Sequence, residues 1–128
     1  VNHNAAEYYE APVSIHLNKG VINSNKILET LKDGIYISNL WYLNFSDRNN
    51  GRITGLTRFG CFMVENGEYK GPINTMRFDE TVYNVFGDKL VGLTDKSQLL
   101  MDSSTYEERS TYSSTIPGAI VEDFKMTL

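Results

Sequence analysis

The sequence has few of the residues from which metal sites and disulfides are built: one cysteine, Cys61, and two histidines, His3 and His16. A single cysteine excludes a disulfide within the chain and is typical of a reducing compartment, so we expect a cytoplasmic protein. No apolar run approaches the roughly 20 residues that a membrane-spanning helix requires, so no membrane association is expected. Lys and Arg are scattered and the net charge is −4, which argues against nucleic-acid binding.

Patterns that mark common catalytic sites are also absent from the sequence. A zinc peptidase needs three protein ligands and usually a glutamate base, whereas neither histidine here is followed by Glu. His16 lies in an alternating segment, where a structural role is favoured over a ligand role. The sequence contains neither a GxSxG elbow nor a phosphate-binding P-loop. The residues alone therefore indicate no catalytic or metal-binding set.

The strongest local signal is the pair Asn66-Gly67, which separates two strand-like runs within residues 52–74. A type I′ turn requires positive φ at both central residues, and Asn-Gly adopts this conformation at low cost. The segment predicts a β-hairpin.

Alternating or β-branched and aromatic segments predict further strands over 13–17, 34–44, 98–101 and 119–128. Helices are expected over 24–32, capped by Asn23 or Ser24 and ended by Gly34, and over 80–86, capped by Asp79. Residues 90–97 read as irregular chain, and the polar segment 102–115 reads as a loop. Because strands outnumber helices and connections are mostly short, the predicted fold is mainly β, or α+β by strict count. We expect an antiparallel sandwich- or barrel-like domain with one or two short packed helices.

Aromatic residues gather on or beside the central strands: Trp41, Tyr42, Phe45, Phe59, Phe62 and Tyr69. Aromatics on strands are mostly core residues or cross-strand pairs, and we favour that interpretation. The alternative is a groove that holds an extended peptide beside a strand edge, with residues 105–115 as its partner edge or lid.

Several motifs occur in a fixed order along the chain: PVSIHLNKG at 12–20, GIYI at 34–37, Thr54-Gly55, VENGE at 64–68 before Gly-Pro, and Pro117 ahead of the last predicted strand. This order resembles the C-terminal domain of the TldD/PmbA family, which includes TldE. That family comprises zinc-metallopeptidase-related proteins of peptide maturation, once labelled modulators of DNA gyrase. The negative charge of this chain gives no support for DNA contact.

The resemblance implies that the zinc helix of the family, with its HExxxH motif, lies outside this chain. Metal-bearing members take a further Cys ligand from the region that corresponds to residues 108–111, which are Glu-Arg-Ser-Thr here. Cys61 lies in the hairpin instead, where we expect a buried apolar role. The resemblance thus implies the TldE/PmbA-like or a TldD-related branch without the zinc site, with no cofactor in this chain and zinc possible in a partner subunit or in related members.

We accordingly expect residues 1–128 to form one domain, excised from a longer protein, that helps to hold a peptide substrate. The motif positions assign substrate contacts to Asn44, Thr54 and Arg58, and we add Trp41 from the aromatic cluster. The chain alone is expected to be inactive and to work in a homo- or heterodimer with a TldD-like subunit. The rival hypothesis is a structural domain whose strand edges join subunits. A small-ligand-binding β-barrel is a third possibility.

Overall fold

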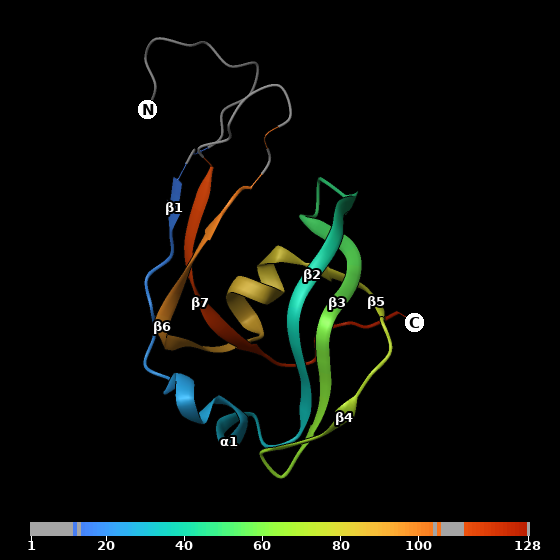
Figure 1. The fold of residues 1–128 in the computed structure, drawn as a ribbon. Coiled ribbons are helices and arrows are strands. Elements are labelled where there is room, and N and C mark those ends of the chain that lie inside the picture. The colour runs from blue at the N-terminus through green and yellow to red at the C-terminus, as the bar shows by residue number, and fades with distance from the viewer. Residues whose placement is uncertain (1–11, 13, 104, 106–111, 128) are drawn as a thin grey trace.

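The computed structural model describes residues 12, 14–103, 105 and 112–127, which form two β-sheets and a few short helices (Figure 1). The first sheet has the strand order β1-β7-β6, with bounds Ser14–His16, Ser113–Val121 and Leu90–Met101. The second sheet contains β2 (Gly34–Asp47), β3 (Arg52–Glu65), β4 (Glu68–Pro72) and β5 (Arg77–Thr81). The helical elements are η1 (Ser24–Lys26), α1 (Ile27–Leu31) and the π-helix η2 (Asn84–Asp88), which contacts strands of both sheets.

Strand β3 is the centre of the second sheet. Strand β2 pairs with it in antiparallel fashion over nearly its whole length. The other side of β3 is shared, because β4 pairs with the segment Phe62–Glu65 and β5 pairs with Arg52–Leu56. At the β3–β4 turn Asn66 has φ 53° and Gly67 has φ 77°, as the predicted hairpin requires. Strand β2 is therefore an edge strand of this sheet.

The C-terminal segment after β7 connects the two sheets. Its backbone pairs with β5, since the Asp79 N–H donates to the Lys125 carbonyl (3.1 Å) and the Thr127 N–H donates to the Arg77 carbonyl (2.7 Å). The ring of Phe124 packs against that of Phe78, with centroids 5.2 Å apart. The segment thus covers the side of β5 that faces away from β3.

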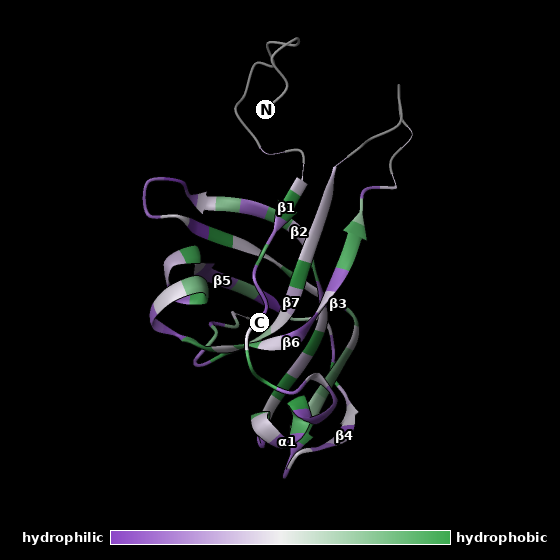
Figure 2. Ribbon diagram, turned by 90° about the vertical axis from the view of Figure 1, so that its left-hand side faces the viewer, coloured by the Kyte–Doolittle hydropathy of each residue, from purple (hydrophilic) through white to green (hydrophobic). Residues whose placement is uncertain are grey.

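Few side chains of the described residues are buried. They include Cys61, Ile120, Thr94 and the four that are fully buried, Phe78, Glu80, Val64 and Thr57. Many large apolar side chains are exposed instead. They include those at the end of β6, which is coloured as hydrophobic in Figure 2 and is separated from β1 by β7. Among the described residues, no helix has both the length and the apolar character needed to cross a membrane.

The predicted fold class is confirmed, and so are the strands at β1 and β2 and the hairpin of β3 and β4. The predicted first helix forms as η1 followed by α1, and the Asn23 side chain caps it by accepting a hydrogen bond from the Asn25 N–H (2.9 Å). The positive φ that ends the helix belongs to Lys32 (61°) and not to Gly34, which begins β2. Lys32 reaches this conformation with its N–H still bonded to the Leu28 carbonyl.

Asp79 does not cap the second helix, because it lies inside β5 and forms an ion pair with Arg52. The hydroxyl of Thr81 takes the capping role by accepting a hydrogen bond from the Asn84 N–H (3.2 Å). Residues 90–97 are not irregular, since they form the first part of β6, which pairs with β7.

The last strand also begins earlier than expected, at Ser113, and ends at Val121. The predicted loop over 102–115 is therefore wrong for 113–115, whose cross-strand partners are Leu99, Leu100 and Met101. Residues 104 and 106–111 of that loop lie outside the described residues.

Candidate functional site

Three register shifts interrupt the pairing of β2 with β3, and two of them are β-bulges in which an aromatic residue has a positive φ. The first of these two bulges follows Trp41, where Tyr42 and Leu43 lie opposite Gly55 alone before pairing resumes at Asn44. Tyr42 has φ 58°, a left-handed conformation that usually belongs to glycine at such a bulge. Its side chain is 79% exposed, so the surrounding structure does not bury the strained residue.

The second bulge lies on β3, where Phe59 and Gly60 face Ser38 alone. Phe59 has φ 62° and its side chain is 72% exposed, so a second exposed aromatic residue takes the left-handed conformation. The Ser38 hydroxyl donates to the Arg58 carbonyl (3.2 Å) across this bulge. Strained residues of this kind occur most often at functional sites. The part of the β2–β3 pair that contains the two bulges is therefore the first candidate for a functional site.

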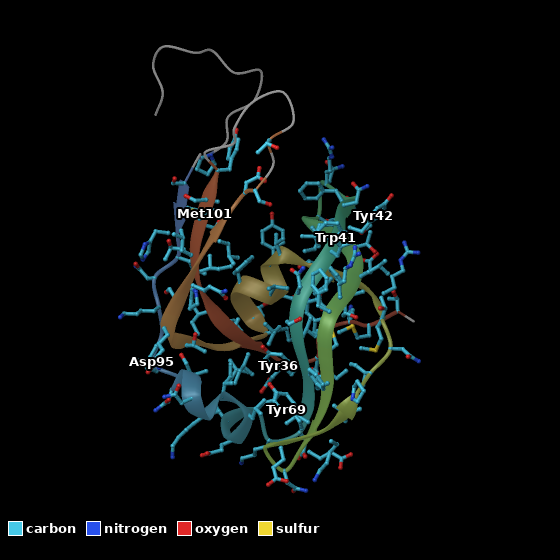
Figure 3. The ribbon with its side chains drawn as sticks, viewed as in Figure 1. Tyr36, Trp41, Tyr42, Tyr69, Asp95 and Met101 are labelled. Carbon is cyan, nitrogen blue, oxygen red and sulfur yellow. The ribbon has the colours of Figure 1, made fainter. Side chains whose placement is uncertain are left out.

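Between the bulges lie only three cross-strand pairs, from Asn39 with Arg58 to Trp41 with Leu56. The guanidinium carbon of Arg58 lies 4.7 Å from the centroid of the Trp41 ring and 5.3 Å from that of Phe59. Within the described residues no carboxylate forms an ion pair with Arg58. Figure 3 shows Trp41 and Tyr42 in the half of β2 that lies away from α1.

The other two predicted site residues, Asn44 and Thr54, are direct cross-strand partners on the far side of the Tyr42 bulge. Their polar groups have local partners. The Thr54 hydroxyl donates to the Phe78 carbonyl (2.7 Å), and the Asn44 side chain accepts from the Phe45 N–H (2.9 Å). The structure thus brings together two pairs, Trp41 with Arg58 and Asn44 with Thr54, and substrate contact by any of the four stays a prediction.

The Thr-Gly motif has a structural explanation. Thr54 joins β3 to β5 through its hydroxyl, and Gly55 leaves room for two close neighbours. A Cβ atom on Gly55 would lie 2.8 Å from the Trp41 carbonyl oxygen and 2.9 Å from the Cε1 atom of Phe78. The motif therefore allows the bulge after Trp41 to sit over the buried Phe78 ring.

The sequence matches a known family over nearly its full length. The family is described as PmbA/TldA metallopeptidase C-terminal domain, and the match covers residues 2–128. The chain belongs to this family. The resemblance to the C-terminal domain of TldD/PmbA proteins is thereby confirmed.

Among solved structures, the chain is similar to TldE from Thermococcus kodakarensis, with a TM-score of 0.70 and 16% sequence identity. The similarity covers 90% of this chain and 24% of that chain, so the present chain spans about a quarter of that protein. At this identity the likeness shows a shared fold. No curated protein matches the sequence.

The metallopeptidase description requires a test of whether this domain can hold zinc. The described residues contain no group of three His, Cys, Asp or Glu side chains that could surround a metal ion. Cys61 is buried and its thiol lies 3.5 Å from the Arg58 carbonyl oxygen, while His16 is exposed on β1. The described part of this PmbA/TldD-type domain does not fit a zinc site. His3 and residues 108–111 lie outside it, so the absence of a zinc site from the whole chain stays a prediction.

The aromatic residues of β2, β3 and β4 separate into two groups. Near α1, Tyr69 packs against Tyr36 (5.5 Å between centroids) and Phe62 (5.0 Å), in the cross-strand packing favoured from the sequence. Burial raises the pKa of Tyr69, with a smaller contribution from Tyr36. The second group, Trp41 and Phe59, contacts the Arg58 guanidinium and is exposed. The sequence did not separate these groups, because the left-handed positions of the bulges are occupied by Tyr42 and Phe59 and not by glycine.

The strain at Tyr42 predicts an unusual substitution. A left-handed conformation costs a residue with a side chain roughly 1–2 kcal/mol, whereas glycine adopts it freely but loses about 0.5–1 kcal/mol of chain entropy on folding. Tyr42→Gly should therefore raise the free energy of unfolding, by up to about 1 kcal/mol, in urea denaturation followed by circular dichroism.

The matched control is Tyr83→Gly, because Tyr83 is 68% exposed and has an ordinary φ of −68°. Its replacement should lower the free energy of unfolding by about 0.5–1 kcal/mol. Equal losses for the two variants would show that the Tyr42 side chain contributes more to folding than its backbone conformation costs.

Proposed function

We propose that this PmbA/TldD-type domain holds an extended peptide against the outer edge of β2, beside the exposed pair formed by Trp41 and Arg58. The observation that carries the proposal is the combination of these two features on one strand. Strand β2 is 14 residues long, and no other described strand pairs with its outer edge. The cation–π pair lies near the middle of that strand.

An unpaired strand edge binds extended peptides by adding them to the sheet. Backbone hydrogen bonds supply affinity, and side chains along the edge supply specificity. The bulges limit the length of β2 that can pair regularly with another strand, because a bulge twists a strand away from flat pairing with another sheet edge. They leave the short regular window Asn39–Trp41, in which the aromatic surface and the edge are adjacent.

In this proposal the domain positions the peptide and does not cleave it. The described residues offer no metal cluster, so any hydrolysis in the parent protein would be carried out by another domain or by a TldD-like partner subunit. We therefore expect no peptidase activity from the 128-residue chain alone. The family description, which names metallopeptidases, supports a peptide as the bound molecule.

Hydrogen exchange of the parent protein tests the proposal. Addition of an unstructured peptide should slow amide exchange in β2 by about tenfold or more at saturating peptide, because the edge N–H groups gain partners. Trp41→Ala should weaken this protection, whereas the control Phe86→Ala, which removes an exposed aromatic of η2, should not. Protection of β2 that depends on protein concentration and not on peptide would contradict the proposal and favour subunit assembly.

The assembly hypothesis has an observation of its own, on the first sheet. Ile15, Leu100 and Met101 are exposed and line a shallow hollow of about 270 Å³ at the end of β1 and β6. Contiguous exposed apolar residues often mark contacts with other protein surfaces. We assign subunit contacts, if the domain makes them, to this end of the first sheet and not to β2.

A further inference from the structure

The Arg58 guanidinium lies over aromatic rings, and no carboxylate of the described residues forms an ion pair with it. Its ring contacts with Trp41 and Phe59 fix the position of the charge. The nearby Arg52 differs, because Asp79 forms an ion pair with it at 3.1 Å. No ion pair with Arg58 is found in the described part of the chain, although the sequence as a whole carries a net charge of −4.

A guanidinium stacked on aromatic rings keeps its N–H groups available at the rim. These donors match the two oxygens of a carboxylate, which accept them as a parallel pair of charge-assisted hydrogen bonds. The rings also exclude water from one face of the cation, which strengthens its attraction to an anion relative to a fully solvated arginine. The geometry therefore suits a carboxylate as the group that completes the site.

The position of Arg58 in the sheet indicates where that carboxylate lies. Arg58 is on β3, one strand away from the outer edge, and its guanidinium extends diagonally to Trp41 on β2. This reach brings the charge one strand closer to a peptide paired with the edge. A side chain of that peptide on the same face as Trp41 would be its nearest neighbour.

We propose that the peptide held by β2 carries an acidic side chain, Asp or Glu, next to Trp41, and that Arg58 selects it. This inference rests on the proposed peptide-holding function. The carboxylate belongs to a side chain and not to a C-terminus, because β2 (Gly34–Asp47) extends beyond Trp41 in both directions. An extended peptide that lies along the strand therefore runs past Trp41, even though the bulge interrupts regular pairing there.

The test uses the full-length parent protein and three fluorescein-labelled peptides of one uncharged, unstructured sequence. The first has a central Glu and a blocked C-terminus, the second has Gln at that position, and the third has Gln and a free terminal carboxylate. Anisotropy titrations at low salt should show the Glu peptide binding about tenfold more tightly than either other peptide, a difference of about 1.4 kcal/mol. The preference should fall with added salt, as expected for an exposed ion pair.

Arg58→Gln should abolish the preference for Glu while leaving the weaker binding of the Gln peptide in place. Arg48→Gln is the matched control, because Arg48 is also exposed and lies over an aromatic ring, that of Phe45 (5.5 Å), outside the window between the bulges. An equal loss of the preference for Glu in both variants would show that the preference comes from overall positive charge and not from Arg58, and would overturn the inference. Tighter binding of the peptide with the free terminus would overturn the assignment to a side chain.

The outcomes separate this inference from the function on which it rests. If the Glu and Gln peptides bind the wild-type protein equally and both protect β2 from exchange, the acidic preference is wrong and the peptide-holding function stands. If no peptide binds or protects β2, the proposed function itself fails. Folding of the Arg58→Gln variant is checked by its unchanged circular dichroism spectrum, as expected for an exposed side chain.

Discussion

Replacing Phe78 with alanine should lower the free energy of unfolding by about 3–5 kcal/mol, the usual cost of removing a fully buried ring. The Phe78 side chain has no exposed surface. Its ring packs against Phe124 at 5.2 Å, and its Cε1 atom would meet a Cβ on Gly55 at 2.9 Å. The ring thus joins β5, β3 and the C-terminal segment, so filling the resulting cavity would require two of these elements to move.

The effect should reach the candidate site, because Gly55 lies between Phe78 and the Trp41 carbonyl. Urea denaturation measures the stability change, and hydrogen exchange should show faster opening at the amides of Asp79 and Thr127, which bond the C-terminal segment to β5. Phe86→Ala is the control, since this side chain is largely exposed and its loss should cost less than about 1 kcal/mol. Similar losses for the two variants would mean that Phe78 is not a centre of the core.

The hairpin of β3 and β4 could be predicted from the sequence because its signal is local. Asn66 and Gly67 both adopt positive φ, and the two residue types that tolerate this conformation best occupy those positions. Strand β5 could not be predicted in the same way. Its inward-facing residues are Phe78 and Glu80, and a buried glutamate reads as a polar, solvent-facing residue until its hydrogen-bond partners are known.

The starts of β6 and β7 were predicted too late in the sequence for a related reason. The polar segment 94–97 interrupts β6 at a register shift, where the buried Thr94 hydroxyl donates to the Lys96 carbonyl (2.9 Å) and accepts from the Gly118 N–H (2.8 Å). Pro117 on β7 lies beside this irregularity, where a strand tolerates a residue without an N–H. These strands depend on pairing between distant segments, which a local pattern does not reveal.

The candidate site could be predicted only in part. The family motif indicated Arg58 and the aromatic cluster included Trp41, and the structure places these two side chains in contact. The bulges at Tyr42 and Phe59 gave no signal, because the residue type that marks such a bulge is glycine and both positions are aromatic. The strained aromatic residues are therefore the feature that sequence reasoning missed, and one of them, Phe59, lies against the charge that we assign to ligand recognition.

The second large effect is expected at Glu80, whose carboxylate is 1% exposed. One oxygen accepts hydrogen bonds from the Thr81 N–H (2.7 Å) and the Asn84 side-chain amide (2.8 Å), and the other accepts from the Lys125 N–H (3.3 Å). Glu80→Gln keeps one acceptor oxygen but turns an amide donor toward another donor. We expect the free energy of unfolding at pH 7 to fall by about 2–3 kcal/mol, the range for hydrogen bonds lost from a buried charged group.

The loss should depend on pH in a defined direction. Burial raises the pKa of Glu80, but the hydrogen bonds from Thr81, Asn84 and Lys125 outweigh burial and hold the pKa below its ordinary value of 4.5. Between the folded and unfolded pKa values the unfolded chain binds more protons, so stability rises with pH in that window. The stabilisation by the Glu80 carboxylate is therefore complete above about pH 4.5 and is lost as the pH falls through the lower folded value.

The wild-type protein and Glu80→Gln should accordingly differ most near neutral pH, and the difference should shrink below about pH 4.5. Urea denaturation at a series of pH values measures it. Hydrogen bonds also lower the pKa of Asp47, Asp95 and Asp123, but these groups are present in both proteins and cancel in the difference. Glu29→Gln is the control, because Glu29 is exposed and its ion pair with Lys26 is long (3.6 Å), so its effect should be small. A difference for Glu80→Gln that stays constant with pH would show that the side chain acts through packing and not as a carboxylate.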